Sequence, residues 1–209
     1  MDIDAIRLIG GHPALDFVNS VENRDAADEN NYLPSYDALA RWAVRAELLA
    51  PAEAGRLGRG KVAAKVWRDL MRLRGAMHRV FLAVARHEAP PPEALADLNR
   101  QIRQASGHLR LDPRGDHFQD PGSGHLHWGW DVPVDDPRRL QWELALSAAE
   151  LLTSDRTARI HKCAHEDCDW LFLDTSRAGR RRWCRMDVCG NITKLRRFRA
   201  RNRPRPRKS

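Results

Sequence analysis

Four cysteines have the type and spacing most specific for one chemistry in this chain. They form two Cys-x4-Cys pairs separated by fifteen residues, and the sequence holds no other cysteine: Cys163, Cys168, Cys184 and Cys189. Two short loops that each offer a pair of thiolates can meet at one tetrahedral zinc ion, about 2.3 Å from each sulfur. Because four thiolates leave no open position for water or substrate, the spacing predicts one structural zinc ion.

Three other uses of this region stay open at this point. Disulfides are typical of small secreted domains, but the N-terminal sequence MDIDAIRLIGGHPALDF has no basic segment followed by an apolar one. An iron–sulfur cluster also takes four thiolates, although its usual motifs bring three cysteines close together. His161 and His165 flank the first pair, and either could replace a sulfur. We expect all four cysteines to be the ligands.

The C-terminal end of the chain is strongly basic. Residues 177–209 contain fourteen Lys or Arg and one acid, a net charge of +13, so residues 1–176 carry −5 of the total +8. This asymmetry indicates a polyanionic partner, which favours nucleic acid. No apolar run approaches the roughly 20 residues of a membrane helix, so we expect a cytoplasmic protein that does not contact a membrane.

The basic residues fall into three groups around and beyond the cysteines. Three arginines lie near a turn, a helix ITKLRRFRAR is expected after Gly190 with Asn191 as its N-cap, and the tail NRPRPRKS is expected to be extended. In the helix, an apolar stripe of Ile192, Leu195 and Phe198 can pack on the finger and leave a basic face for the major groove. The extended tail fits a minor groove. The residues expected to contact nucleic acid are Arg180, Arg181, Arg182, Lys194, Arg196, Arg197, Arg199, Arg201, Arg203, Arg205 and Arg207.

Two features of this region also have plainer interpretations. The basic helix can be a solvated helix with a frayed end. Between the cysteine pairs, a strand is expected over 170–173, with a turn over 174–179 and a return toward Trp183. We expect Trp170, Phe172 and Trp183 to form the small core of the finger, because aromatic residues supply most of the burial in small folds.

The elements that precede the finger read mainly as helices. Apolar residues at three- and four-residue steps predict helices after Ser35, over 51–58, 61–87 and 93–105, and from Asp136 to Leu152. In 126–132 apolar and polar residues alternate, which predicts a strand, with a partner around 109–111 and a loop over 112–124. The predicted fold is mainly α with a small antiparallel β element: a helical N-terminal domain, then a small four-cysteine zinc finger with a C-terminal basic helix.

The first domain offers few residues for chemistry. Asp16 and Asn19 are three apart in the apolar segment PALDFVNS, so they share one side of a helix and either line a ligand pocket or cap backbone groups. The segment 117–130, rich in His and Trp, is the most enzyme-like feature, yet no nucleophile with an evident base accompanies it. We expect no catalytic residue and no enzyme activity.

The stretch CAHEDCDWLFLDTSRAGRRRWCRMDVCGN with its basic helix closely resembles the CGNR zinc finger family of bacterial proteins. The N-terminal GGHPALDFVNS, with Tyr36, Leu39 and Trp42, resembles the start of the ABATE domain, described as a stress-induced transcription regulator. The resemblance implies an ABATE-like ligand-sensing domain over 1–155, a CGNR-type finger over 156–201 and a basic tail over 202–209. One position departs: the family's Cys-Gly-Asn-Arg reads Cys-Gly-Asn-Ile here, so a contact made by that arginine would be missing at Ile192.

Together these observations lead us to expect a zinc-dependent, DNA-binding transcriptional regulator of the stress response that answers to a small-molecule effector. A homodimer on a two-fold operator would fit a single finger. Three alternatives stay open. The first is an RNA-binding protein. The second is an enzyme whose site lies around Asp16, Asn19 and the His/Trp strand, with the finger as a docking module. The third is a finger that binds a protein partner.

Overall fold

The computed structural model describes residues 6–24, 27, 29–57, 60–112 and 126–202. These residues form seven α-helices: α1 (Pro13–Val18), α2 (Tyr36–Arg45), α3 (Pro51–Arg56), α4 (Lys61–Ala85), α5 (Pro92–Ser106), α6 (Arg138–Thr153) and α7 (Asn191–Arg201). Three antiparallel strand pairs accompany them: β1 (Val21–Glu22) with β2 (Asn30–Asn31), β3 (Leu109–Asp112) with β4 (His127–Trp130), and β5 (Ile160–Lys162) with β6 (Leu171–Leu173). The predicted mainly α fold is confirmed. None of the described helices is both long and apolar enough to cross a membrane.

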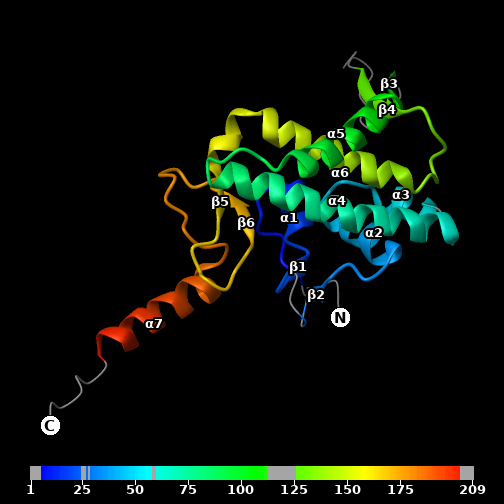
Figure 1. The fold of residues 1–209 in the computed structure, drawn as a ribbon. Helices are drawn as coiled ribbons and strands as arrows, with labels where there is room; N and C mark the ends of the chain where they lie inside the picture. Colours follow the sequence, from blue (N-terminus) through cyan, green and yellow to red (C-terminus); the bar gives the residue numbers. More distant parts are fainter. Residues whose placement is uncertain (1–5, 25–26, 28, 58–59, 113–125, 203–209) are drawn as a thin grey trace, which may run out of the picture.

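The long helix α4 runs through the first domain, with α1, α5 and α6 packed against it (Figure 1). Its apolar face, with Leu70, Met77 and Phe81, is buried as the three- and four-residue steps predict. Ser35 caps α2 as expected, because its hydroxyl accepts the backbone N–H of Ala38 at 3.2 Å. The predicted helices of this domain are therefore confirmed.

The alternating segment forms β4, whose partner is β3 as expected. Leu109 faces Trp130 and Leu111 faces Trp128 across the pair. The Trp130 ring packs against Trp142 of α6, with ring centroids 5.5 Å apart, and Trp128 is 71% exposed. From residue 113 to residue 125, the expected loop and the histidines within it lie outside the described residues.

In the finger, β6 pairs with a strand that the sequence patterns did not indicate. The expected strand over 170–173 forms, but its partner is β5, before the first cysteine, and not the stretch leading to Trp183. Leu171 and Leu173 of β6, and Ile160 of β5, are buried in the core of the first domain. The chain does turn after Leu173 and return toward Trp183, since the Asp174 carboxylate accepts the Arg181 N–H at 2.9 Å, but the returning stretch is not a strand. The short 3₁₀ helix η2 (Asp155–Arg159) joins α6 to β5.

The basic helix α7 follows directly from a short π-helical turn, η3 (Met186–Gly190). Gly190 is already helical, with φ −64° and ψ −48°, so Asn191 is the first helical residue and not the N-cap. Glycine is needed at this position for space, because a Cβ there would lie 2.5 Å from the Met186 sulfur. Beyond η3 the helix projects away from the rest of the molecule (Figure 1).

Candidate metal centre and nucleic-acid interface

The four cysteines come together from two loops of the finger. Cys163 follows β5 and Cys168 precedes β6, whereas Cys184 precedes η3 and Cys189 lies within it. Their four sulfurs all lie within 4.8 Å of one another, and Cys163, Cys184 and Cys189 are buried. The separations of Cys184 Sγ from Cys168 Sγ and Cys189 Sγ are 3.7 and 3.6 Å.

These separations fit a zinc ion. Four sulfurs at about 2.3 Å from a tetrahedral centre lie about 3.8 Å from each other. A disulfide would bring a pair of sulfurs to about 2.05 Å, and all four cysteines are free. Without an ion the four thiols share their protons, so the pKa of Cys163 is lowered by hydrogen bonds from Cys168 and Cys184 while the pKa values of the other three cysteines are raised. Thiolates are ligands that zinc accepts readily. The cluster is thus positioned to bind one metal ion, consistent with a single structural zinc.

Neither neighbouring histidine belongs to this cluster in the described chain. His165 is buried, and its Nδ1 accepts the backbone N–H of Asp167 at 3.2 Å, which shapes the loop between the first two cysteines. The His161 ring packs against Phe172, with centroids 5.9 Å apart. Phe172 is fully buried beside the cysteines, with Trp170 and Trp183 packed around it. The aromatic residues therefore form the finger's core, as expected.

The finger is held on the first domain by strand β6 and its flanks. Asn19 binds the backbone of Leu171 twice, accepting its N–H at 2.9 Å and donating to its carbonyl at 2.7 Å. The Leu173 N–H donates to the Gly10 carbonyl at 2.7 Å, and the Trp170 indole donates to the Val21 carbonyl at 3.2 Å. Since Leu171 and Leu173 also belong to the main core, the metal loops are continuous with the packing of the first domain.

The pair Asp16 and Asn19 lies at this junction. Both side chains are buried and both bind backbone groups: Asp16 accepts the Gly10 N–H at 2.7 Å, and Asn19 binds Leu171. Neither residue lines the cleft described below. The sequence left two roles open for this pair, lining a ligand pocket or capping backbone groups. The hydrogen bonds correspond to the second role.

Asp16 gives the fold a measurable pH dependence. Burial raises the pKa of Asp16 to about 6, against hydrogen bonds from Gly10 and Ile9 that lower it. An unfolded Asp titrates near pH 4, so the folded chain binds the proton more tightly and loses stability as the pH rises from about 4 to 6. Asp16→Asn keeps an acceptor for Gly10 without the charge. The free energy of unfolding of the variant minus that of the wild type, measured with urea, should therefore rise by about 2 kcal/mol from pH 4 to pH 7. A difference that stays constant with pH would contradict this.

The arginines of the turn have different surroundings. Arg180 and Arg182 are exposed, and the Arg182 guanidinium lies 5.2 Å from the centre of the Trp183 ring. Arg181 differs from its predicted role: its guanidinium turns inward, 4.2 Å from the centre of the Phe172 ring. It donates to the carbonyls of Cys184 at 2.7 Å and Ile9 at 2.9 Å. Because these donors are already used within the fold, Arg181 stabilises the finger and does not present its guanidinium to a nucleic acid.

Arg181→Gln should therefore affect stability. Truncating the guanidinium leaves partly buried carbonyls without donors, which typically costs about 1–3 kcal/mol in the free energy of unfolding. Arg180→Gln, one residue away and exposed, should change it by less than about 0.5 kcal/mol. Urea unfolding of the two zinc-loaded variants makes the comparison, and equal losses would contradict the structural role of Arg181.

Most basic residues of α7 are exposed. Lys194, Arg197 and Arg201 lie on one face at helical spacing, and Arg199 is also exposed. Arg196 is paired with Glu166 and with Asp167 at 3.0 Å, so it ties the helix to the loop between the first two cysteines. The tail residues Arg203, Arg205 and Arg207 lie outside the described residues.

The apolar stripe of α7, formed by Ile192, Leu195 and Phe198, does not pack on the finger as expected. These side chains are 41%, 48% and 61% exposed. The helix packs on η3 at its start and makes the ion pairs of Arg196. The expected packing is wrong because η3 leads the helix away from the finger core. Ile192 still lines a hollow beside Cys168 and Trp170, but Leu195 and Phe198 lie beyond it.

Comparison with known families accounts for nearly the whole chain. A model named ABATE, described as "Putative stress-induced transcription regulator", matches residues 11–155, more than half of the sequence. The chain belongs to the ABATE family. The CGNR zinc finger model matches residues 159–202, which contain all four cysteines and α7. No curated protein matches the chain. The resemblance that the sequence indicated is confirmed, and these matches suggest a zinc-binding regulator.

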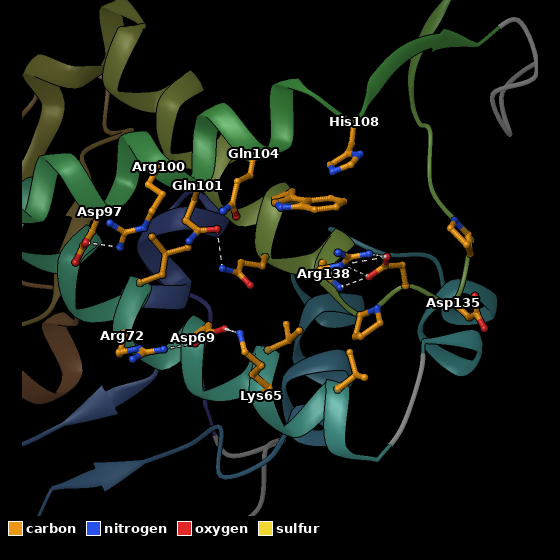
Figure 2. Close-up of a pocket in the computed structure, with 18 residues that line it drawn as sticks. Lys65, Asp69, Arg72, Asp97, Arg100, Gln101, Gln104, His108, Asp135 and Arg138 are labelled. Carbon is orange, nitrogen blue, oxygen red and sulfur yellow. Dashed lines mark hydrogen bonds and ion pairs between the residues drawn. The ribbon is translucent and has the colours of Figure 1, made fainter.

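The ABATE domain contains a broad cleft of about 1230 Å³, whose lining residues are drawn in Figure 2. Its walls come from α4, α5, the start of α6 and the segment before α6. Most of its charges are paired within the cleft, as in Lys65 with Asp69 at 2.9 Å and Arg138 with Asp136 at 2.5 Å. The amides of Gln101 and Gln141 bind each other at 2.7 Å, and His108 stacks on Trp142 with ring centroids 4.4 Å apart.

Proposed function

We propose that this protein is a zinc-dependent, DNA-binding transcriptional regulator that acts in the cytoplasm and has no enzyme activity. In this proposal, residues 1–155 sense a ligand, residues 156–201 form the finger and residues 202–209 form a basic arm. The observation that carries it is α7, a helix that projects from the cysteine cluster with most of its basic side chains in solvent. An exposed basic helix on a rigid support is a suitable shape for a DNA groove.

The DNA surface in this proposal has a centre and a flank. Lys194, Arg197 and Arg201 of α7 form the centre, and Arg180 and Arg182 of the turn form one flank. Arg199 lies on the other side of α7 and would meet phosphate only from there. The sequence adds Arg203, Arg205 and Arg207 directly after α7, so they would contribute further positive charge to the same end of the chain.

Arg196 can contact DNA only if its ion pairs with Glu166 and Asp167 break and a phosphate replaces these carboxylates. The position of the family's arginine holds Ile192 here, which cannot bind phosphate. Contacts from the other basic residues to phosphates would therefore position the helix on the DNA.

Effector binding is proposed for the cleft in Figure 2. It lies between α4, α5 and α6, and α4 also packs against β5, while α6 leads into η2. A ligand that shifts these helices would therefore strain the strand pair that carries Cys163 and Cys168. Its mixed, internally paired charges suit a neutral or zwitterionic compound with hydrogen-bonding groups.

The effector proposal has a direct test. A compound found by thermal shift should lose its effect on Tm in Gln104→Trp, which narrows the cleft at an exposed position of α5. The same compound should change the DNA affinity of the wild type and leave that of Gln104→Trp unaltered. Cleft ligands that never change DNA affinity would contradict the proposed coupling.

DNA and RNA binding are separated by competition. Zinc-loaded protein bound to a labelled random-sequence DNA duplex is challenged with unlabelled duplex DNA or structured RNA at one fixed salt concentration. We expect the DNA competitor to displace the label at least tenfold more effectively. Stronger displacement by RNA would favour the RNA-binding alternative, because arginine-rich segments also bind RNA and fold on it.

A further inference from the structure

Helix α7 is attached to the finger at two places. Its first turn continues directly from η3, and the Thr193 hydroxyl donates to the Cys189 carbonyl at 2.7 Å. Near the middle of the helix, Arg196 forms ion pairs with Glu166 and with Asp167, which lie in the loop between the first two cysteines. The start of the helix therefore belongs to one metal-binding loop, and its middle is tied to the other.

The second attachment matters because α7 has little else to hold its direction. The helix has 11 residues, and none of them is buried in the described part of the chain. Isolated helices shorter than about 12–15 residues are marginal in water. Arg197 and Arg201 lie four residues apart, and like charges at this spacing weaken a helix further. The carboxylates of Glu166 and Asp167 therefore act on a helix that is otherwise held mainly at its start.

The two carboxylates meet α7 on the side away from its basic face. At 3.6 residues per turn, Arg196 lies roughly 100–160° around the helix from Lys194, Arg197 and Arg201. The ion pairs turn the Arg196 side of the helix toward the loop between the first two cysteines. The basic face is left in solvent, where its three side chains can meet phosphates at the same time.

We propose that Glu166 and Asp167 are positioning residues for DNA binding, which hold α7 through Arg196 both in the free protein and on DNA. This inference rests on the proposed DNA-binding function. Two acids without this role would only repel phosphates, so their removal would tighten binding. As positioning residues they have the opposite effect, because a helix that is free to change direction must lose that freedom when DNA binds it.

The deciding comparison uses two pairs of acids in the full, zinc-loaded chain. Glu166→Gln/Asp167→Asn breaks the attachment, whereas the control Asp155→Asn/Asp169→Asn removes two exposed acids that do not contact Arg196. Affinity is measured on a random-sequence duplex at ~50 mM salt, where exposed ion pairs are only weakly screened. The first variant should bind about three- to tenfold more weakly than the wild type, since exposed ion pairs are individually modest. The control should bind as tightly as the wild type or slightly more tightly.

Two further readouts separate positioning from loss of structure. Both double variants should keep one zinc per chain and a Tm within about 2 °C of the wild type, because the four substituted side chains are exposed. In hydrogen exchange without DNA, the α7 amides of Glu166→Gln/Asp167→Asn should exchange faster than in the wild type. The amides of β5 and β6 should keep their protection.

Arg196 itself gives the second test. Arg196→Gln should weaken binding as much as Glu166→Gln/Asp167→Asn does, and the triple variant should bind no more weakly, since the three residues act as one unit. Arg196→Gln should leave the slope of log affinity against log salt unchanged. Lys194→Gln, which removes a phosphate contact, should make that slope shallower by about 1.

Three results would overturn the positioning role while DNA binding stands. They are tighter binding by Glu166→Gln/Asp167→Asn, wild-type exchange of its α7 amides, and a salt slope in Arg196→Gln that is shallower by about 1. No binding by any form, even at low salt, would overturn the proposed function together with this inference.

Discussion

Removing the zinc is expected to destabilise the ABATE domain as well as the finger. The ion joins two loops through four thiolates, and metal binding contributes about 10–16 kcal/mol in model fingers. Here the loop that holds Cys163 and Cys168 connects β5 to β6, and Leu171 and Leu173 of β6 are buried in the main core. Loss of the ion should release β6, expose these side chains and lower the Tm of the whole chain by more than about 10 °C.

The zinc prediction is measured by hydrogen exchange with and without a chelator. Amides of α1, which packs on β6, and of α6, which packs on η2 just before β5, should lose protection together with those of the finger. Cys184→Ser should show the same loss before any chelator is added, and the chelator should have no further effect on it. Metal analysis of the wild type should give one zinc per chain. Unchanged protection of α1 and α6 in the metal-free protein would show that the finger unfolds alone.

Neutralising the basic face of α7 is expected to abolish most DNA affinity. The triple variant Lys194→Gln/Arg197→Gln/Arg201→Gln removes three exposed cations that have no role in the fold described above. If each neutralises a phosphate, the slope of log affinity against log salt becomes shallower by about 3. At ~50 mM salt the affinity should fall at least tenfold, whereas Tm should stay within about 2 °C of the wild type.

A matched variant separates position from net charge. Arg56→Gln/Arg68→Gln/Arg103→Gln also removes three exposed cations, but these lie on α3, α4 and α5 of the ABATE domain. It should leave the salt slope unchanged. Equal losses of affinity in the two variants would mean that DNA responds to the total charge of the protein and that α7 is not the contact surface.

The features of this protein that could be predicted from sequence are those with local causes. The cysteine spacing predicted the cluster, because ligands on two short loops have few ways to meet at one ion. Periodic apolar residues predicted the helices, and alternation around Trp128 predicted β4. Phe172 was expected in the finger core, since a small fold needs its aromatic residues for burial.

The features that sequence did not reveal depend on partners far away in the chain. Asn19 and Leu171 bind each other across 152 positions, and nothing near either residue identifies the other. The apolar face of α7 was recognisable from its spacing, but the pattern does not say what covers such a face. Arg181 was missed because it lies in a run of three arginines. One signal was available in the sequence. In an extended backbone, the middle side chain of three points to the side opposite its neighbours, so Arg181 would point inward if Arg180 and Arg182 point to solvent.

The central claim is that the zinc-loaded finger with α7 and the basic tail binds DNA, and a salt titration tests it most directly. The affinity of the full chain for a random-sequence duplex is measured over a range of salt concentrations. If roughly five to eight basic side chains meet phosphates, log affinity should fall with log salt with a slope near −5 to −7. No binding at low salt, or a slope near zero, would contradict the account and favour a protein partner for the basic end.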